Sequence, residues 1–270
     1  MALRALIFPS SSHIHFFTFR KRKLKQLLEE REIRNIIMKN VILKGKIDED
    51  LRHQLYVLQA HMLNLLHETT MTKVESNDSR ALEKLKELRK IAFDVQTGPQ
   101  QRSSQEYWKK LGFRDHINPI MDFQETPPGM LALELMYRFA SKHPENYTRF
   151  AVFAGWADNH DFPFARTSIE LVKILCEVVN IGHDPASSSS SAQFHPMFFA
   201  HENPLDEMFA VVIKHVNKTW REMRATTADF DKVMEVAKEQ VGETMTKLSM
   251  TVRATITWFQ PIAKIRMNWS

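Results

Sequence analysis

The side chains that could do chemistry in this sequence are few, and their spacing does not match a common catalytic or metal-binding motif. His61 and His67, like His195 and His201, lie six residues apart, so the two rings of each pair would lie on different faces of a helix. Helical zinc ligands are spaced four apart. Cys176 is the single cysteine, which leaves no second thiol for a metal site. We therefore expect no bound metal and no cofactor, and interpret the histidines as surface or loop-anchoring residues.

Asp122, in the segment MDFQ, is a candidate general base. The sequence does not, however, identify a partner residue that would shift the pKa of its carboxyl. We favour an Asx-type hydrogen bond, in which its carboxylate accepts from a nearby backbone N–H and so holds an irregular turn. Arg166, Arg221 and Arg224 could each stabilise phosphate charge as an arginine finger does, yet isolated arginines near helix ends are usually solvated. The sequence has neither a Gly-rich phosphate loop nor a G-x-S-x-G elbow, so these motifs predict no enzyme.

Composition indicates an all-α protein. The chain has 270 residues, of which 43% are hydrophobic and 26% are charged, as expected for a globular protein with a core. Only 7 are glycine, whereas sandwiches, barrels and Rossmann sheets consume glycine in tight turns. No apolar run approaches the roughly 18 to 20 residues that cross a bilayer. With a single cysteine and no clear signal peptide, the chain is expected to be cytoplasmic.

The net charge of +5 is concentrated at one end of the chain. Residues 1–46 carry eleven Lys/Arg against three Glu, a local balance of +8, and subtracting this from +5 leaves −3 for the remainder. A nucleic-acid module would carry its positive patch on the folded core, so nucleic acid is not an expected partner. The basic segment 20–46 could contact anionic lipid or an acidic partner, but a solvated helix face is favoured.

Apolar residues recur at helical spacing along the first third of the chain. A helix is predicted over 20–44, ended by Gly45, and a second over 48–69, capped by Asp48. A third opens at Ser76–Ser79. The predicted inward faces are Leu24, Leu27, Leu28, Ile36, Ile37 and Val41 in the first, Leu51, Leu55, Leu58, Met62 and Leu65 in the second, and Leu82, Leu85, Leu88 and Ala92 in the third.

The next segment is predicted to begin with a loop over 94–103, which is rich in turn-forming residues and is the best internal boundary. Ser103 and Glu106 have the spacing of a capping box that would open a short helix. Gly112 is expected to end this helix, with the following residue packing back. Trp108 is expected to anchor the irregular segment that follows.

The most apolar helix is predicted to start at Thr126 as cap, with Pro127 in the first turn, where proline costs no hydrogen bond. Its apolar residues lie on nearly every face: Met130, Leu131, Leu133, Leu135, Met136, Tyr137 and Phe139. A helix without a polar face must lie at the centre of its domain. His143–Pro144 would interrupt it, and another helix is predicted over 144–156.

Three later helices are predicted from caps and periodicity. One places Ile169, Val172, Leu175 or Cys176, and Val179 inward and is closed by Gly182; the next starts at Asn203–Pro204; the last opens near Thr226 with Asp229 in its first turn. Between them, Ser187–Ser191 is expected to be a surface loop. Residues 249–270 alternate in a strand-like way with no second strand to pair with.

Several long segments occur in a fixed order: WKKLGF (108–113), NPIMDF (118–123), TPPGMLALELM (126–136), PFARTSIELVKILCEV (163–178), FHPMFFAHE (194–202) and NKTWREMRATTADFDKVMEVAKEQV (217–241). Together they resemble the ELMO domain of the engulfment and cell motility (ELMO/CED-12) family. REIRNII (31–37) and HQLYVLQAHMLNLL (53–66) resemble the end of that family's armadillo-like helical region. The resemblance marks ten motif positions as candidates for interaction: Trp108, Gly112, Phe113, Asn118, Pro119, Asp122, Phe123, Gln124, Gly129 and Trp220.

The resemblance implies an all-α helical bundle, the ELMO domain, over 48–248 with its central part at 104–248. Remnant armadillo-like helices would precede it over 20–47, and 1–19 and 249–270 stay unassigned. The family's amino-terminal GTPase-binding region, pleckstrin-homology domain and Pro-rich tail have no counterpart in this sequence. A truncated product with an exposed solenoid edge and no independent role is therefore one hypothesis, which would show as self-association.

The family's known role implies a non-catalytic scaffold rather than an enzyme. Its members join a Dock-type guanine-nucleotide exchange factor and promote activation of the Rac-type small GTPase, actin remodelling, phagocytic engulfment of apoptotic cells and cell motility. Recruitment from the cytoplasm to the plasma membrane would be peripheral.

A sister branch, which has the ELMO domain alone, activates GTP hydrolysis by Arf-type GTPases. Its motif carries an arginine directly after the Asp–Phe pair, where a guanidinium could stabilise developing phosphate charge. In this chain that position is Gln124, which is neutral, and the segment from Phe123 to Gly129 is also longer than in that branch. The resemblance therefore implies no such activating function here.

Overall fold

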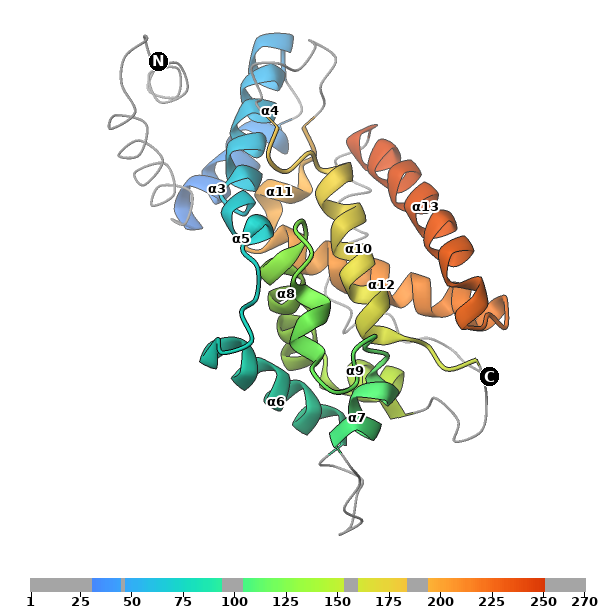
Figure 1. Cartoon of the computed structure of the whole chain (residues 1–270). Coiled ribbons are helices and arrows are strands. Elements are labelled where there is room, and N and C mark those ends of the chain that lie inside the picture. The colour runs from blue at the N-terminus through green and yellow to red at the C-terminus, as the bar shows by residue number, and fades with distance from the viewer. Residues whose placement is uncertain (1–30, 45–46, 94–103, 153–159, 184–193, 251–270) are drawn as a thin grey trace. The chain divides into compact units, whose positions relative to one another are not determined.

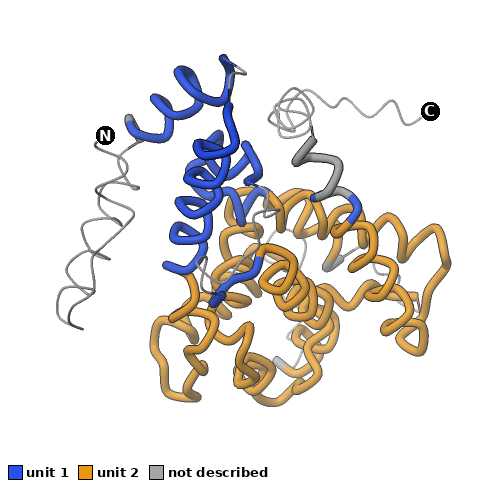
Figure 2. The backbone as a smooth tube through the Cα atoms, turned by 90° about the horizontal axis from the view of Figure 1, so that it is seen from above, with its two compact units in different colours: residues 1–65, 180–207, 243–270 blue, residues 66–179, 208–242 orange. Residues whose placement is uncertain are grey.

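The computed structural model describes residues 31–44, 47–93, 104–152, 160–183 and 194–250. Every regular element within these ranges is a helix (Figure 1), which confirms the predicted all-α class. The chain divides into two compact units, each built from segments that are far apart in the sequence (Figure 2). Unit 1 comprises residues 1–65, 180–207 and 243–270, and unit 2 comprises residues 66–179 and 208–242.

Unit 1 is built around one long helix, α4 (Glu49–Asn64). The predicted cap of α4 is confirmed, because the Asp48 carboxylate accepts the Leu51 N–H at 2.8 Å and so satisfies a backbone donor of the first turn. α4 ends at Asn64, so the single helix predicted over 48–69 is in fact two helices separated by a turn. The other helices of this unit are α3 (Arg31–Ile37), which continues into the π-helix η1 (Met38–Ile42), and α11 (Met197–Ala200).

The rotation of α3 differs from the prediction. Ile36 is 55% exposed, whereas Arg34 is only 7% exposed. The Arg34 guanidinium donates to the Glu202 carbonyl at 2.7 Å and to the His201 carbonyl at 3.4 Å, just after α11. Carbonyls at a helix end lack intrahelical donors, and a buried arginine is stable only when it is paired. We infer that this pairing, rather than hydrophobic periodicity, orients α3.

Two amide side chains of α4 form hydrogen bonds with the backbone of the later segment of unit 1, residues 180–207. The Asn64 amide donates to the His183 carbonyl at 2.8 Å and accepts the Gly182 N–H at 2.7 Å. The buried Gln59 accepts the His195 N–H at 2.6 Å. Burial lowers the pKa of the His195 ring to about 4, so the ring is neutral at physiological pH. His195 therefore helps anchor a loop, through its backbone.

Unit 2 contains the remaining helices. They are α5 (His67–Met71), α6 (Ser79–Phe93), α7 (Ser104–Leu111), the 3-10 helix η2 (Pro119–Phe123), α8 (Gly129–Lys142), α9 (Pro144–Val152), α10 (Phe164–Val178), the 3-10 helix η4 (Thr227–Asp229), and most of α12 (Pro204–Glu222) and α13 (Phe230–Met250). The predicted starts of the last two are confirmed. α12 begins at the proline after Asn203, and Asp229 accepts the N–H and hydroxyl of Thr226 in a capping box before α13.

The centre of unit 2 is α8, which packs against α5, α6, α9, α10 and η2 (Figure 1). Five of its large apolar side chains are each 3% exposed or less: Leu131, Leu133, Leu135, Met136 and Phe139. This confirms the prediction of a central apolar helix, although Met130 and Tyr137 are only half-buried. α8 therefore contributes apolar burial on several faces rather than along one stripe.

Phe139 of α8 joins several helices through ring contacts. Its centroid lies 6.0 Å from those of Phe150 in α9 and Phe164 in α10, and 5.8 Å from that of Phe209 in α12. Aromatic pairs at this separation contribute roughly 0.5 to 1.5 kcal/mol each beyond their buried area. This cluster therefore fixes the packing of the helices that surround α8.

α8 begins later than predicted, and Thr126 does not cap it. The first helical residue is Gly129, preceded by Pro128 at the cap position without a side-chain hydrogen bond. A helix that began at Pro127 would have two prolines in its first turn, neither of which has an N–H for the threonine hydroxyl. The Gly129 N–H donates instead to the Glu125 carbonyl at 3.0 Å.

α6 exposes one residue that was predicted to face inward. Leu85, Leu88 and Ala92 are buried as predicted, but Leu82 is 47% exposed. The buried stripe starts at Ala81, and a residue one position further along is rotated by about 100° around the helix. Leu82 therefore lies at the edge of the face that packs on α8 and α9.

α10 ends at Val178, and the residue that closes it is not the predicted Gly182. Asn180, directly after the C-cap, adopts φ 56°, a left-handed conformation that asparagine tolerates. Several other predictions lie outside the described residues: the start of helix 20–44 with Gly45, the loop 94–103 with the Ser103–Glu106 box, the end of helix 144–156, Ser187–Ser191, and the alternation beyond Met250. None of the helices in the described ranges is long and apolar enough to span a membrane.

Candidate functional site

Nine of the ten candidate residues lie in one stretch of unit 2, from α7 to the start of α8. α7 ends at Leu111, and Gly112 adopts φ +79°, a conformation that favours glycine. A Cβ at this position would lie 2.4 Å from the Pro163 Cα, and the Gly112 carbonyl accepts the Arg166 N–H at 3.2 Å. Gly112 thus ends α7, as predicted, and allows a close approach to the start of α10.

Three aromatic residues attach the motif segment to α7. The Phe113 N–H donates to the Trp108 carbonyl at 3.1 Å, and the Phe113 ring meets the Trp108 ring edge-on at 5.5 Å. Phe123 contacts Phe113 in the same manner at 6.0 Å, and all three rings are buried. Trp108 therefore anchors the irregular segment, as predicted.

Two carboxylates organise the backbone between α7 and η2. Asp122 accepts the Arg114 N–H at 2.7 Å through Oδ2 and the Asp115 N–H at 3.1 Å through Oδ1. Asp115 in turn accepts the Ile117 N–H at 2.9 Å and the Asn118 N–H at 2.7 Å, as in an Asx turn. Four N–H groups of an irregular loop are thereby satisfied, and the loop is held in one conformation.

The environment of Asp122 favours a structural role over a chemical one. Burial raises the pKa of its carboxyl, while the hydrogen bonds from the Arg114 and Asp115 backbone act in the opposite direction. Both of its oxygens accept backbone N–H groups, whereas a general base must direct an oxygen at a substrate proton. The predicted hydrogen bonding of Asp122 to backbone is confirmed, but the predicted local Asx type is wrong, because the donors lie seven and eight residues earlier in the chain.

Gln124 follows η2 and is half-buried, with its N–H donating to the Met121 carbonyl at 3.3 Å. The next residue, Glu125, accepts a hydrogen bond from the Lys173 ammonium of α10 at 2.6 Å. This bond lowers the pKa of Glu125 and raises that of Lys173. Because the Glu125 side chain is 60% exposed, the pair contributes at most about 1 kcal/mol. It ties the loop that carries Gln124 to α10.

The three candidate arginines differ in their surroundings. The Arg166 guanidinium lies 3.6 Å from the centroid of the Phe230 ring and 3.4 Å from the Asp231 carboxylate. Its side chain is 27% exposed, so the expectation that it is solvated is wrong. Burial is the main cause that lowers its pKa. Arg166 thus packs α10 against α13, whereas Arg221 and Arg224 are exposed.

Gly129 is the position where the motif segment meets the chain between α5 and α6. Its φ is +49°, and a Cβ would lie 2.4 Å from the Thr72 carbonyl oxygen. The same carbonyl accepts the Met130 N–H at 2.8 Å. At the other end of the segment, Asn118 is half-buried and precedes η2, and Pro119 is buried at its first position.

Trp220 lies apart from the motif segment, on α12. It is 1% exposed, and its Nε1–H donates to the His160 carbonyl at 2.8 Å. Its ring meets those of Phe162 at 5.9 Å and Phe230 at 6.5 Å. Trp220 therefore packs within the core of unit 2.

Sequence reasoning missed three residues that shape this region: Arg114 and Asp115, which donate to Asp122, and Ile117, which is 80% exposed. The pairing of Asp122 with distant backbone has no local sequence signal, because an Asx turn reaches only about two residues along the chain. Ile117 could have been noticed as an aliphatic residue between turn-forming neighbours, where burial is not expected.

Replacing Asp122 by asparagine should lower the free energy of unfolding by about 1 to 3 kcal/mol, because one oxygen becomes an NH₂ group facing a backbone N–H. Urea denaturation of the purified chain at neutral pH measures this change. Asp231→Asn is the matched control: its side chain is 94% exposed, and its loss should cost less than about 1 kcal/mol. Equal stability of the two variants would contradict the bracing role of Asp122.

The fold and the motif segment define a helical domain in which a hydrogen-bonded loop is braced against an enclosed central helix. A family model described as ELMO/CED-12 matches residues 64–234, which is more than half of the chain. The chain belongs to the ELMO/CED-12 family.

Curated relatives agree with this assignment. The human Engulfment and cell motility protein 1 is 42% identical over 238 residues, which cover 84% of this chain and 32% of that protein. The human proteins 2 and 3 of the same name are 41% and 37% identical, covering 82% and 91% of this chain. The matches cover 32% to 34% of the length of these relatives, so the chain spans about a third of each of them.

Proposed function

We propose that this chain acts as a non-catalytic adaptor that works with a Dock-type guanine-nucleotide exchange factor. In this role it promotes activation of a Rac-type GTPase, actin remodelling, engulfment of apoptotic cells and cell motility. It acts in the cytoplasm and is recruited peripherally to the plasma membrane. The observation that carries the proposal is the family match over 64–234, together with relatives named for engulfment and cell motility.

The motif segment supports a non-catalytic role. Position 124 is glutamine, and a neutral amide does not offset developing phosphate charge as a guanidinium does. The neighbouring Asp122 uses both oxygens for backbone hydrogen bonds. These two residues therefore favour an adaptor over an enzyme that activates GTP hydrolysis.

The adaptor role is tested by co-precipitation. Tagged chain and a Dock-type exchange factor are expressed together in cells, and the Rac-GTP content of the lysate is measured alongside recovery of the factor. We expect recovery of the factor and a rise in Rac-GTP relative to the tag alone. The destabilised variant Trp220→Ala serves as a control that should lose both. A folded chain that recovers no factor and leaves Rac-GTP unchanged would contradict the proposal.

The competing function, activation of Arf-type GTPases, is tested by GTP hydrolysis with the purified chain. We expect no acceleration by the wild-type chain. The Gln124→Arg variant is measured in the same assay. We expect that it does not accelerate GTP hydrolysis either, because the segment from Phe123 to Gly129 also differs from that of the Arf-activating branch. Acceleration by the wild-type chain that is abolished in Gln124→Ala would replace the adaptor proposal with an enzymatic one.

A further inference from the structure

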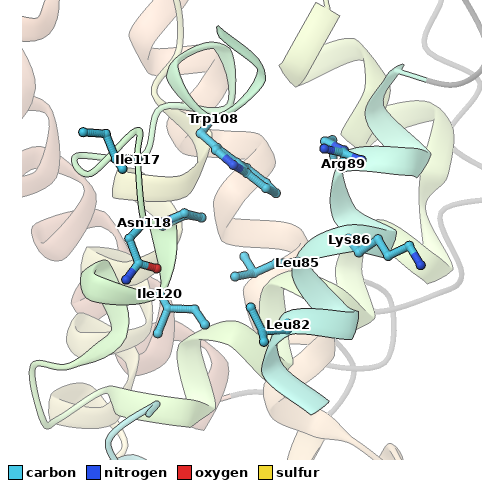
Figure 3. A pocket seen from close by; sticks show the side chains of 9 residues that line it. Leu82, Leu85, Lys86, Arg89, Trp108, Ile117, Asn118 and Ile120 are labelled. Carbon is cyan, nitrogen blue, oxygen red and sulfur yellow. The ribbon is translucent and has the colours of Figure 1, made fainter. Parts of the chain in front are cut away.

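A groove in unit 2 lies beside the motif segment, between α6 and residues 117–120. We call it the α6 groove. Its volume is about 250 Å³, and it is open to solvent on one side. Figure 3 shows Leu82 and Leu85 of α6 facing Ile120 across it, with the Trp108 indole at one end. A cavity of roughly 150 Å³ accepts a benzene ring, so the α6 groove can hold one or two large apolar side chains.

The groove has an apolar rim that is open to solvent. Ile117 is 80% exposed and Leu82 is 47% exposed, and both line it. The two residues come from segments far apart in the sequence, so the exposed apolar surface does not follow from the periodicity of one helix. Exposed apolar residues that line one groove are a feature by which interaction sites are recognised, whereas apolar residues scattered singly are not.

The conformation that exposes Ile117 is held by hydrogen bonds. Its N–H donates to the Asp115 carboxylate at 2.9 Å, and the Asp115 N–H donates to the Asp122 carboxylate at 3.1 Å. Little conformational freedom therefore remains to be lost on binding, and pre-organisation of this kind raises affinity. Asp115 and Asp122 thus position an apolar side chain next to the groove.

The positive charge at the groove favours an acidic partner over a basic one. The charged residues that line it are Lys86 and Arg89, both basic and both on α6. Figure 3 shows the Lys86 side chain extending from α6 away from the groove, and its flexible stem can turn to bring the ammonium to an acid bound at the rim. An acidic group on the partner is therefore complementary to this edge.

We propose that the α6 groove is a docking site for a short acidic segment of a partner protein, which inserts one or two large aliphatic or aromatic side chains beside Ile117 and places Asp or Glu against Lys86 and Arg89. The volume fits side chains of a single short segment rather than a folded surface. The proposal does not depend on the partnership with the exchange factor, because it rests on the groove alone.

The test is selection of a random dodecapeptide display library on the intact chain, followed by binding of the selected synthetic peptides by fluorescence anisotropy. We expect peptides that combine large apolar residues with Asp or Glu. Ile117→Ser should weaken their binding about tenfold or more, as expected for losing a buried aliphatic side chain. Lys86→Glu should weaken it by about fivefold and reduce its salt dependence.

Met121→Ser is the matched control, because Met121 lies in η2 and is 43% exposed but does not line the groove. Its binding should equal that of the wild-type chain, and thermal unfolding should be unchanged in all three variants. Failure to select any peptide whose binding depends on Ile117, or selection of basic peptides, would overturn the proposal.

Two other occupants are distinguished by parallel measurements. Binding of the chain to phosphatidylserine vesicles that is lost in Ile117→Ser, without peptide binding, would replace the peptide by a membrane surface. Self-association in sedimentation velocity that is lost in Ile117→Ser would replace it by a second copy of this chain. Either result overturns the proposal as stated.

Discussion

Replacing Gly129 by alanine is expected to lower the free energy of unfolding by about 3 kcal/mol, the sum of backbone strain and overpacking. Gly129 has φ +49°, and an added Cβ would lie 2.4 Å from the Thr72 carbonyl oxygen and 2.9 Å from that of Thr70. Thr72 cannot simply retreat, because its carbonyl accepts the Met130 N–H at 2.8 Å. The substitution therefore opposes the docking of α8 against the chain after α5.

The measurement is urea denaturation followed by circular dichroism, with Gly242→Ala as the matched control. Gly242 is inside α13, and apart from the neighbouring backbone of that helix no heavy atom of the described residues lies within 4 Å of a Cβ built there. Alanine there should raise stability by about 0.5 to 1 kcal/mol, as expected for a glycine in a helix interior. We therefore expect the same glycine-to-alanine change to lower the free energy of unfolding at position 129 and to raise it at position 242. A small effect at both positions would contradict the role of Gly129 in the packing of α8.

Gly129 also shows where sequence-based prediction succeeds and where it ends. The apolar character of α8 predicts its central position, because Leu131, Leu133 and Met136 place apolar side chains on several of its faces. The start of α8 was predicted incorrectly, since local pattern placed a cap at Thr126 without accounting for the missing N–H groups of the prolines. The contact between Gly129 and Thr72 joins residues far apart in the sequence, and local rules contain no information about it.

In unit 1 and in α6, too, some features follow from local sequence pattern and others depend on residues far away in the sequence. The Asp48 cap was predicted because its donor lies three residues away. The burial of Arg34 was not, because its acceptors follow α11, more than 160 residues later. The helical periodicity predicts that Leu82 faces inward, but it does not define the edge of the buried face of α6. In unit 1, the prediction that held is the one whose donor and acceptor are close in the sequence, although the incorrect cap at Thr126 shows that a local pattern can also mislead.

At the candidate site, too, the sequence predicts the local features and not the long-range contacts, and here the family resemblance contributes as well. The family resemblance marks residues of 108–129 as candidates for interaction, which stays a prediction, and the hydrogen bonding of Asp122 to backbone is predicted from its residue type. What the grouping means physically could not be predicted, because the Arg114 and Asp115 donors and the exposed Ile117 become apparent only when the loop is folded. In this structure, the motif residues mainly stabilise a loop, and a residue beside them carries the exposed surface.

Replacing Trp220 by alanine is expected to lower the free energy of unfolding by about 4 kcal/mol, within the range for deleting a large buried aromatic side chain. Trp220 is 1% exposed and meets the Phe162 ring at 5.9 Å. Its indole N–H donates to the His160 carbonyl at 2.8 Å, and its own carbonyl accepts the Ala225 N–H at 3.0 Å. Urea denaturation gives the change in free energy.

Trp220→Phe separates the two contributions of this side chain. Phenylalanine retains much of the apolar contact with Phe162 and Phe230 but leaves the His160 carbonyl without its donor, so a smaller loss of roughly 1 to 3 kcal/mol is expected. The order Ala, then Phe, then wild type in rising stability would follow from a tryptophan that both fills the core and satisfies a carbonyl. A phenylalanine variant as unstable as the alanine variant would show that the hydrogen bond dominates. A loss below about 1 kcal/mol for alanine would contradict the burial on which the packing of α12 depends.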